Sequence, residues 1–156
     1  MRHDEGDCDE PAATMTESRP EIPIAIRGLE SPDLDLVFSS WLSTYRYSPS
    51  VRSIPNGRYF AGQHLRIERL IERGAVLLAV NPHDPAQVYG WCCTEGTENP
   101  AVHYVCVKST YQRMGVASRL LAPLLGLVAE YTHRTGLVQE LPIPRTWTYD
   151  PYRLDR

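Results

Sequence analysis

One stretch constrains the fold of this 156-residue chain more than any other. An apolar run over residues 101–107 predicts a buried strand, and a leucine-rich pattern from residue 116 onward predicts a helix. The short link between them contains Gly115, which lets the backbone approach a ligand closely because glycine has no Cβ. A strand, a glycine turn and a helix start are typical of a phosphate-binding site, because the N–H groups of the turn point toward the anion.

The chain divides into an acidic N-terminal segment and one domain of ordinary size. Residues 1–21 contain seven acidic residues against two arginines, a net charge of −5, whereas the whole chain carries −3. Residues 22–156 therefore carry +2. We expect residues 1–21 to be disordered because they have little apolar surface to bury. Residues 22–156 are expected to form the folded domain.

The hydrophobic pattern predicts an α/β domain. We expect strands over residues 22–26, 75–80, 87–93 and 101–108, and helices around residues 34–42, 61–72 and 116–131. Pro123 falls inside the last helix and should make it irregular. Residues 146–149 can form a fifth strand, but little sequence remains beyond it. The C-terminal part is therefore short, and either the sheet is truncated or a second chain completes it as a homodimer.

The four cysteines do not have the spacing of a metal site. Cys92 and Cys93 are adjacent, so their side chains point to opposite faces of a strand, and the same holds for His103 and Cys106. We expect no bound metal, and reduced thiols of the kind found in cytoplasmic proteins. We also expect no membrane association, because no apolar run is long enough to span a bilayer and no signal peptide is recognisable.

The glycine turn resembles the acyl-CoA signature of the GCN5-related N-acetyltransferases, which reads Gln/Arg-x-x-Gly-x-Gly/Ala. Gln112, Gly115 and Ala117 occupy the three defining positions. The residue before the glycine is usually basic in that family, whereas here it is Met114, and Arg113 stands one place earlier. This departure weakens the side-chain contribution to phosphate binding and leaves the backbone contribution intact.

The order of predicted elements is similar to that family over residues 22–131. The resemblance implies a mixed, mostly antiparallel, splayed sheet flanked by helices. It implies an N-acyltransferase that uses acetyl-CoA, or another acyl-CoA, as co-substrate. In that family pantetheine runs between splayed strands four and five. The cofactor-binding residues implied here are Val105, Cys106, Val107, Gln112, Arg113, Met114, Gly115, Val116 and Ala117.

Acyl transfer to an amine needs a base and an acid. In several family members the base is a glutamate early in strand four, but the matching residue here is Ala101. His103, two residues on, is the predicted base because its ordinary pKa suits the task. The same histidine could instead fill a partly buried position of the sheet, and Glu95 and Glu98 are alternatives. The family often uses a tyrosine after strand five as acid, which implies Tyr149 and Tyr152.

Acceptor choice in this fold depends largely on the segment between the first two helices. Aromatic and cationic residues alternate there, which suits an anionic acceptor or a nucleobase stacked beside a phosphate backbone. Alternatively, the aromatic residues belong to the core and the arginines are solvated. The predicted substrate-binding residues are Tyr45, Arg46, Tyr47, Arg52 and Arg58.

Three functions stay open on the sequence. The leading hypothesis is transfer of an acetyl or other acyl group to a small-molecule or macromolecular amine. A second is modification of a DNA base, as in the phage Mom-type proteins that share this fold, with nucleic acid as partner. The third is a non-catalytic relative that binds CoA or a protein partner.

Overall fold

A six-stranded sheet forms the centre of the computed structural model, which describes residues 21–127, 129–134 and 144–155. The strands lie side by side in sequence order. The first four strands pair with one another in antiparallel fashion, whereas the fourth, fifth and sixth strands run parallel to one another. The strands are β1 (Ala25–Gly28), β2 (Ala75–Asn81), β3 (Asp84–Glu95), β4 (Ala101–Val107), β5 (Glu130–Tyr131) and β6 (Thr148–Tyr149). The predicted mixed, mostly antiparallel sheet is confirmed.

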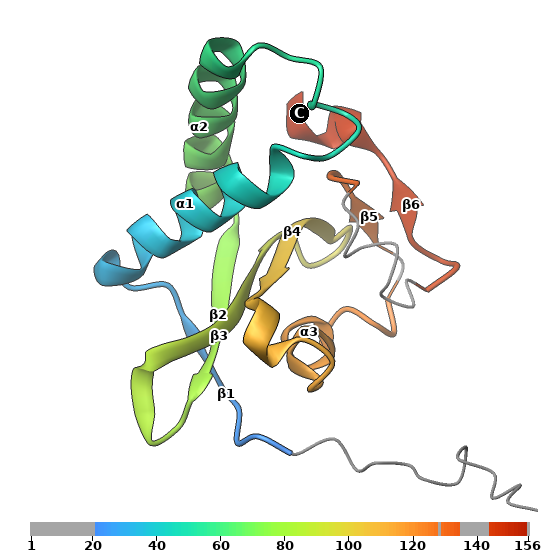
Figure 1. Ribbon diagram of the computed structural model, residues 1–156. Coiled ribbons are helices and arrows are strands. Elements are labelled where there is room, and N and C mark those ends of the chain that lie inside the picture. Colours follow the sequence, from blue (N-terminus) through green and yellow to red (C-terminus); the bar gives the residue numbers. More distant parts are fainter. Residues whose placement is uncertain (1–20, 128, 135–143, 156) are drawn as a thin grey trace, which may run out of the picture.

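Helices cover both faces of this sheet (Figure 1). Helices α1 (Leu34–Tyr45) and α2 (Asn56–Arg73) pack on one face, and the short α3 (Val116–Leu121) packs on the other. The adjacent cysteines of β3 show the alternation directly. Cys93 lies in the core under α1 and α2, and Cys92 lies in the core under α3. The acidic segment that we predict to be disordered lies outside the described residues, apart from Glu21.

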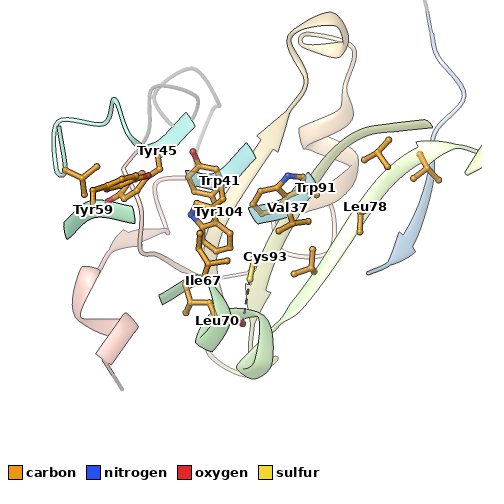
Figure 2. Close-up of a cluster of buried hydrophobic side chains, with 14 residues drawn as sticks. Val37, Trp41, Tyr45, Tyr59, Ile67, Leu70, Leu78, Trp91, Cys93 and Tyr104 are labelled. Atoms are coloured by element: carbon orange, nitrogen blue, oxygen red, sulfur yellow. Dashed lines mark hydrogen bonds between the residues drawn. The ribbon is translucent and has the colours of Figure 1, made fainter. Parts of the chain in front are cut away.

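Stacked aromatic rings fill the core beneath α1 (Figure 2). Trp41 of α1 stacks on Tyr104 of β4 with ring centres 5.0 Å apart, and Trp91 of β3 lies 5.2 Å from Trp41. Such pairs add to the stabilisation that comes from burying the rings. Two polar groups of this cluster are paired, since Trp91 Nε1 donates to Ser40 and the hydroxyls of Thr44 and Tyr104 lie 2.6 Å apart. Trp41 Nε1 is buried and has no hydrogen-bond partner among the described residues.

One extra residue interrupts the pairing of β3 with β4. Cys93 lies opposite Tyr104, but the next residue of β3, Thr94, lies opposite Val102, so His103 has no partner position. This is a β-bulge, which bends and twists a strand locally. Beyond the bulge, β4 stays paired with β3 as far as Val107, whereas its described pairing with β5 covers only Ala101 and Val102. The two strands therefore diverge at the bulge, as the resemblance implies for strands four and five.

The second helix is longer than the sequence predicts. It begins at Asn56 and buries Tyr59, Gln63, Ile67 and Leu70. Gly74 follows the helix with φ −110°, which is extended and open to any residue. Glycine is needed there for another reason, since a Cβ would lie 2.4 Å from the backbone oxygen of Thr94.

The predicted helix over residues 116–131 is wrong beyond Leu121. The helix ends before Pro123, which has no N–H to continue the hydrogen-bond ladder. Glu130 and Tyr131 form β5 instead, so the strand that we expected as the fifth is the sixth. The prediction missed β5 because a strand of two residues carries no readable period.

Candidate active site

The turn that joins β4 to α3 has an unusual backbone. Arg113 has φ +64° and Gly115 has φ +80°, whereas Met114 between them has a negative φ. Successive residues with φ of alternating sign turn their N–H groups toward a common point and form an anion-binding concavity. The described residues contain no other non-glycine residue with positive φ. This backbone therefore has the form that the sequence predicts for phosphate binding.

Gly115 leaves one side of this turn open. A Cβ built at this residue would meet no atom within 4 Å, so packing does not require glycine there. The positive φ does require it, because L-residues with side chains rarely adopt that conformation. Gly115 is also the cap of α3, and its carbonyl accepts the first helical hydrogen bond, from Arg119. That side of the turn therefore has room for a ligand group close to the backbone of Gly115.

Two side chains fix the turn against the sheet. Gln112 Nε2 donates to the carbonyl oxygen of Val107 at 3.2 Å, and the hydroxyl of Tyr111 accepts from Gln87 Nε2 at 2.7 Å. The ring of Tyr111 also lies 4.6 Å from that of Tyr89. These contacts connect the turn to β3 and β4, so its backbone is positioned before any ligand binds.

The edge of β4 beyond the bulge exposes backbone groups toward the gap. Lys108 donates to the carbonyl of Tyr89, so by the alternation of an antiparallel ladder the amide groups of Cys106 also face β3. Those of Val105 and Val107 face the opposite edge. At that edge the Gln112 side chain donates a hydrogen bond to the carbonyl of Val107, and no other described strand pairs with this part of β4. Of the three predicted strand-four positions, Val105 and Val107 thus present their backbone to the gap, whereas Cys106 belongs to the ladder.

Arg46 is held within the connection between α1 and α2. Its guanidinium donates to the carbonyls of Val51 and Ile54 and to the side chain of Asn56, at 2.8–2.9 Å, and lies over the ring of Tyr59. Since these bonds occupy its nitrogens, Arg46 shapes the loop and does not project toward a substrate. Its substrate-binding role stays a prediction that this placement does not support.

The other predicted acceptor residues differ in exposure. Tyr45 is buried. Its pKa is raised mainly by this burial and to a lesser extent by the neighbouring phenol of Tyr149. Tyr47 is 83% exposed, and Arg52 and Arg58 are also exposed.

The C-terminal tyrosines are placed differently from each other. Ser48 donates to the backbone oxygen of Arg134, and the Arg134 guanidinium lies over the ring of Tyr149 at 5.1 Å. The structure therefore brings Tyr149 next to the α1–α2 connection, and its role as acid stays a prediction. Tyr152 is 72% exposed and lies on the final helical turn, Pro151–Asp155.

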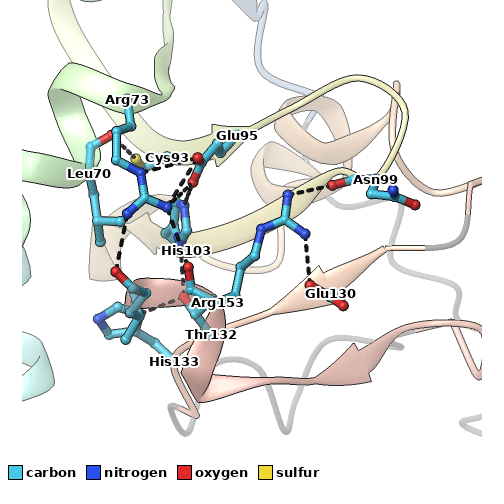
Figure 3. A network of polar contacts seen from close by, with 11 residues as sticks. Leu70, Arg73, Cys93, Glu95, Asn99, His103, Glu130, Thr132, His133 and Arg153 are labelled. Atoms are coloured by element: carbon cyan, nitrogen blue, oxygen red, sulfur yellow. Dashed lines mark hydrogen bonds and ion pairs between the residues drawn. The ribbon is translucent and has the colours of Figure 1, made fainter. Parts of the chain in front are cut away.

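His103 lies inside a chain of buried polar side chains (Figure 3). It is 1% exposed, with Nε2 2.8 Å from Glu95 and Nδ1 3.0 Å from the hydroxyl of Thr132. That hydroxyl lies 2.9 Å from His133 Nδ1, and Gln63 of α2 lies 3.2 Å from His133 Nε2. Both ring nitrogens of His103 are thus engaged, and its role as base stays a prediction.

Burial and pairing determine the charges along this chain. Burial lowers the pKa of His103, and it lowers the pKa of His133 to about 3, so both imidazoles are neutral at pH 7. Burial opposes ionisation of Glu95, but the hydrogen bonds from Arg73 and His103 hold its pKa below the ordinary value. This series of hydrogen-bonded side chains therefore ends at the ionised carboxylate of Glu95.

Sequence reasoning missed most of this polar chain. It named His103 and Glu95, but Gln63, Thr132 and His133 come from distant parts of the sequence and form no motif. Residue 132 follows a strand that the pattern did not predict. Nothing in the sequence pattern connects these residues, because their spacing follows no regular period.

Neither a metal centre nor a membrane span is found where the structure describes the chain. Residues 21–127, 129–134 and 144–155 contain no group of three His, Cys, Asp or Glu side chains that could hold an ion. Their helices include none that combines the length and the apolar character needed to cross a bilayer.

Comparison with solved structures identifies the fold. A histone acetyltransferase HPA2-related structure from Corynebacterium glutamicum superposes with a TM-score of 0.52 at 15% identity, covering 65% of this chain and 69% of that one. The chain has the fold of the GCN5-related N-acetyltransferases. This confirms at the level of fold what the glycine turn predicted.

Two further structures with this fold are similar to the chain. An acetyltransferase of the same family from Staphylococcus aureus has a TM-score of 0.47 at 17% identity, covering 66% of this chain and 64% of that one. The PaiA N-acetyltransferase of Thermoplasma acidophilum, in complex with coenzyme A, has a TM-score of 0.43 at 20% identity, covering 65% and 69%. The chain thus spans about two thirds of these structures. No family model and no curated protein sequence matches it.

Proposed function

We propose that this protein is an acyl-CoA-dependent N-acyltransferase, which transfers an acetyl or other acyl group to an amine. The observation that carries the proposal is the turn over Arg113–Gly115. Its φ angles alternate in sign, it is braced by Gln112 and Tyr111, and a Cβ built at Gly115 would meet no atom within 4 Å. That arrangement suits the pyrophosphate of a CoA thioester.

The residues of β4 suit the remainder of the donor. The amide groups of Val105 face the gap between β4 and the chain that leaves β5, where an extended pantetheine arm can pair with them as a strand would. Preorganised N–H donors of this kind stabilise the oxyanion of acyl transfer and can lower the barrier by roughly 3–4 kcal/mol. Lys108, Arg113 and Arg119 are exposed near the turn and add positive charge for the phosphates.

The acid and the base are proposals of their own. For the acid, Tyr149 is better placed than Tyr152, because it lies beside Arg134 and the α1–α2 connection. For the base we propose His103. Its Nε2–H donates a hydrogen bond to Glu95, so Nδ1 is the nitrogen that can accept a proton. Because His103 and Thr132 are both buried, an amine proton would reach Nδ1 only after the hydrogen bond from the Thr132 hydroxyl opens. A base appears as a rising limb in the pH profile of kcat/KM.

Calorimetry with CoA tests the proposal. The parent protein should bind, and Gly115→Glu should not, because the new carboxylate lies where the phosphates belong and the backbone conformation disfavours any side chain. Gly62→Glu is the matched control, since it adds the same charge on α2, where a Cβ also meets no atom within 4 Å. Equal affinity of parent and Gly115→Glu would remove this site from the proposal.

Native mass spectrometry of the purified protein would identify the acyl group and the stoichiometry together. It also tests the prediction that a second copy completes the sheet. A turnover assay separates an enzyme from a CoA-binding relative without activity. Mass shifts in the DNA nucleosides of expressing cells would instead favour base modification.

A further inference from the structure

The strands β4 and β5 separate at a point occupied by buried polar groups. Among the described residues, the last backbone hydrogen bond between these two strands runs from the N–H of Thr132, just after β5, to the carbonyl of Val102, at 3.1 Å. The hydroxyl of the same Thr132 lies 3.0 Å from Nδ1 of His103, the bulge residue that follows Val102. These side chains thus lie at the apex of the gap.

The hydrogen bonds of this cluster can have only one direction. The Glu95 carboxylate can only accept, so His103 Nε2–H donates to it and His103 Nδ1 must accept. The Thr132 O–H donates to that Nδ1, and its oxygen accepts from His133 Nδ1–H. His133 Nε2 then accepts from the amide of Gln63. Each imidazole nitrogen has a partner, and both tautomers follow from the charge of Glu95.

The hydroxyl of Thr132 has a role in this chain that a methyl group cannot fill. It is the one group that donates to a histidine on one side and accepts from a histidine on the other. Thr132, His103 and His133 are each at most 2% exposed, so water cannot replace a lost bond. Removing the hydroxyl leaves two buried nitrogens unpaired.

His133 and Arg134, which follow Thr132, contact the helices that cover the α1 face of the sheet and the connection between them. The ring of His133 packs 4.7 Å from Tyr45 and 5.7 Å from Tyr104, and the backbone oxygen of Arg134 accepts from Ser48. The direction in which the chain leaves the sheet therefore depends on where His133 is held. Thr132 connects that histidine to the bulge.

We propose that Thr132 is a positioning residue that holds the gap between β4 and the chain leaving β5 at the width that a CoA thioester needs. The inference rests on the proposed function. The hydroxyl beside His103 and Glu95 also resembles a nucleophile with its base and carboxylate. However, it is 2% exposed and already accepts a hydrogen bond, so it positions the backbone and does not attack a substrate.

The test compares two substitutions in the full-length protein. Thr132→Val keeps the shape and removes the hydroxyl, whereas Thr132→Ser keeps the hydroxyl. Calorimetry should give a CoA Kd at least tenfold weaker for Thr132→Val, and within threefold of the parent for Thr132→Ser. Asp33→Asn is the stability control, because it breaks the buried pair of Asp33 with Arg27 far from the gap. It should leave the Kd unchanged.

A second measurement detects the hydrogen bonds themselves. In ¹⁵N NMR spectra the parent should show slowly exchanging imidazole protons on Nε2 of His103 and Nδ1 of His133. Thr132→Ser should retain both signals and Thr132→Val should lose at least the second. If Thr132→Val does not fold, Gln63→Met removes the donor to His133 from the other end, and should weaken CoA binding about threefold.

The possible results separate the two proposals. A parent protein that binds no CoA overturns the proposed function and the role of Thr132 with it. A parent that binds, with Thr132→Val (or, failing that, Gln63→Met) binding equally well, overturns the positioning role alone. The same holds if Thr132→Ser weakens binding as much as Thr132→Val, because the hydroxyl is then not the cause.

Discussion

Arg73 donates to both carboxylate oxygens of Glu95, with Nη2 2.9 Å from Oε2 and 3.1 Å from Oε1. The same guanidinium donates to the backbone oxygens of Leu154 and Arg153. One side chain at the end of α2 therefore fixes the charge of the carboxylate that orients His103, and it also attaches the C-terminal turn to the domain.

Arg73→Ala should lower the free energy of unfolding by about 1–2 kcal/mol, because charged hydrogen bonds at a partly exposed site are lost. Arg73→Lys should recover only part of this, since an ammonium cannot reproduce the planar fork. Arg69→Ala on the same helix is the control, because it has no ion pair in the described residues. Urea denaturation measures all three, and equal effects at residues 69 and 73 would contradict the role of Arg73.

Acid should destabilise the protein well above the pH at which carboxylates protonate. The pKa of His133 is lowered from 6.5 to about 3, and that of His103 is also lowered. The unfolded chain therefore binds more protons below pH 6.5, and stability falls as the pH drops from 6.5 toward 3. One histidine contributes up to about 1.4 kcal/mol per pH unit in this window.

Glu95 adds to this loss at lower pH, as the solution pH falls through its lowered pKa. Unfolding free energies at pH 7.5, 6 and 5 give the slope. His133→Gln should reduce the slope, whereas His83→Gln at the exposed hairpin should not. A flat profile for the parent protein would show that the histidines are not buried as described.

Arg113 occupies a conformation that costs a side chain about 1 kcal/mol. Arg113→Gly should therefore leave stability unchanged or raise it by up to about 1 kcal/mol, while Gly115→Ala should lower it by about 1 kcal/mol. Thermal unfolding provides the comparison. If CoA binds at this turn, Arg113→Gly should also weaken binding slightly and reduce its salt dependence, because one cation is lost.

Close backbone contacts make Gly74 and Gly90 sensitive to substitution. A Cβ at Gly90 would lie 2.6 Å from the carbonyl oxygen of Cys106, and one at Gly74 would lie 2.4 Å from that of Thr94. Either alanine variant should cost more than about 2 kcal/mol, because the sheet backbone must shift. Gly62→Ala in α2 should instead stabilise the protein by roughly 0.5–1 kcal/mol. A tolerated Gly90→Ala would mean that β3 and β4 lie further apart.

Two arginines near the α1–α2 connection should behave differently. Arg46→Ala should destabilise the loop and lower the melting temperature, because it removes four hydrogen bonds. Arg52→Ala should leave the melting temperature unchanged and raise the KM of an anionic acceptor. Steady-state kinetics with an identified amine provide the test. If Arg52→Ala leaves the KM unchanged, the acceptor site does not include Arg52 and lies elsewhere.

The central part of the fold was predictable because its signals are local. Alternating or continuous apolar runs and a glycine turn are visible in residues 75–117, and the structure has strands and a turn in that order. The C-terminal part was predictable only in part. The pattern places a strand over residues 146–149, where β6 lies, but it misses the two-residue β5, whose pairing depends on tertiary contacts. Arg46 looked like a free cation in the sequence, and only the folded loop shows the carbonyls that surround it.

The bulge at His103 shifts the alternation of side chains along β4 by one residue. Val102 faces the core under α3 and Tyr104 faces the core under α1, although both are even-numbered. Deletion of His103 would leave a regular strand in which Val102 and Tyr104, now neighbours, keep these opposite faces. Deletion of Val105 would instead make Cys106 and Val107 exchange faces relative to Tyr104. A length change in this strand should therefore preserve the core only at the bulge, so the position of an insertion or deletion is a stronger constraint on relatives than composition.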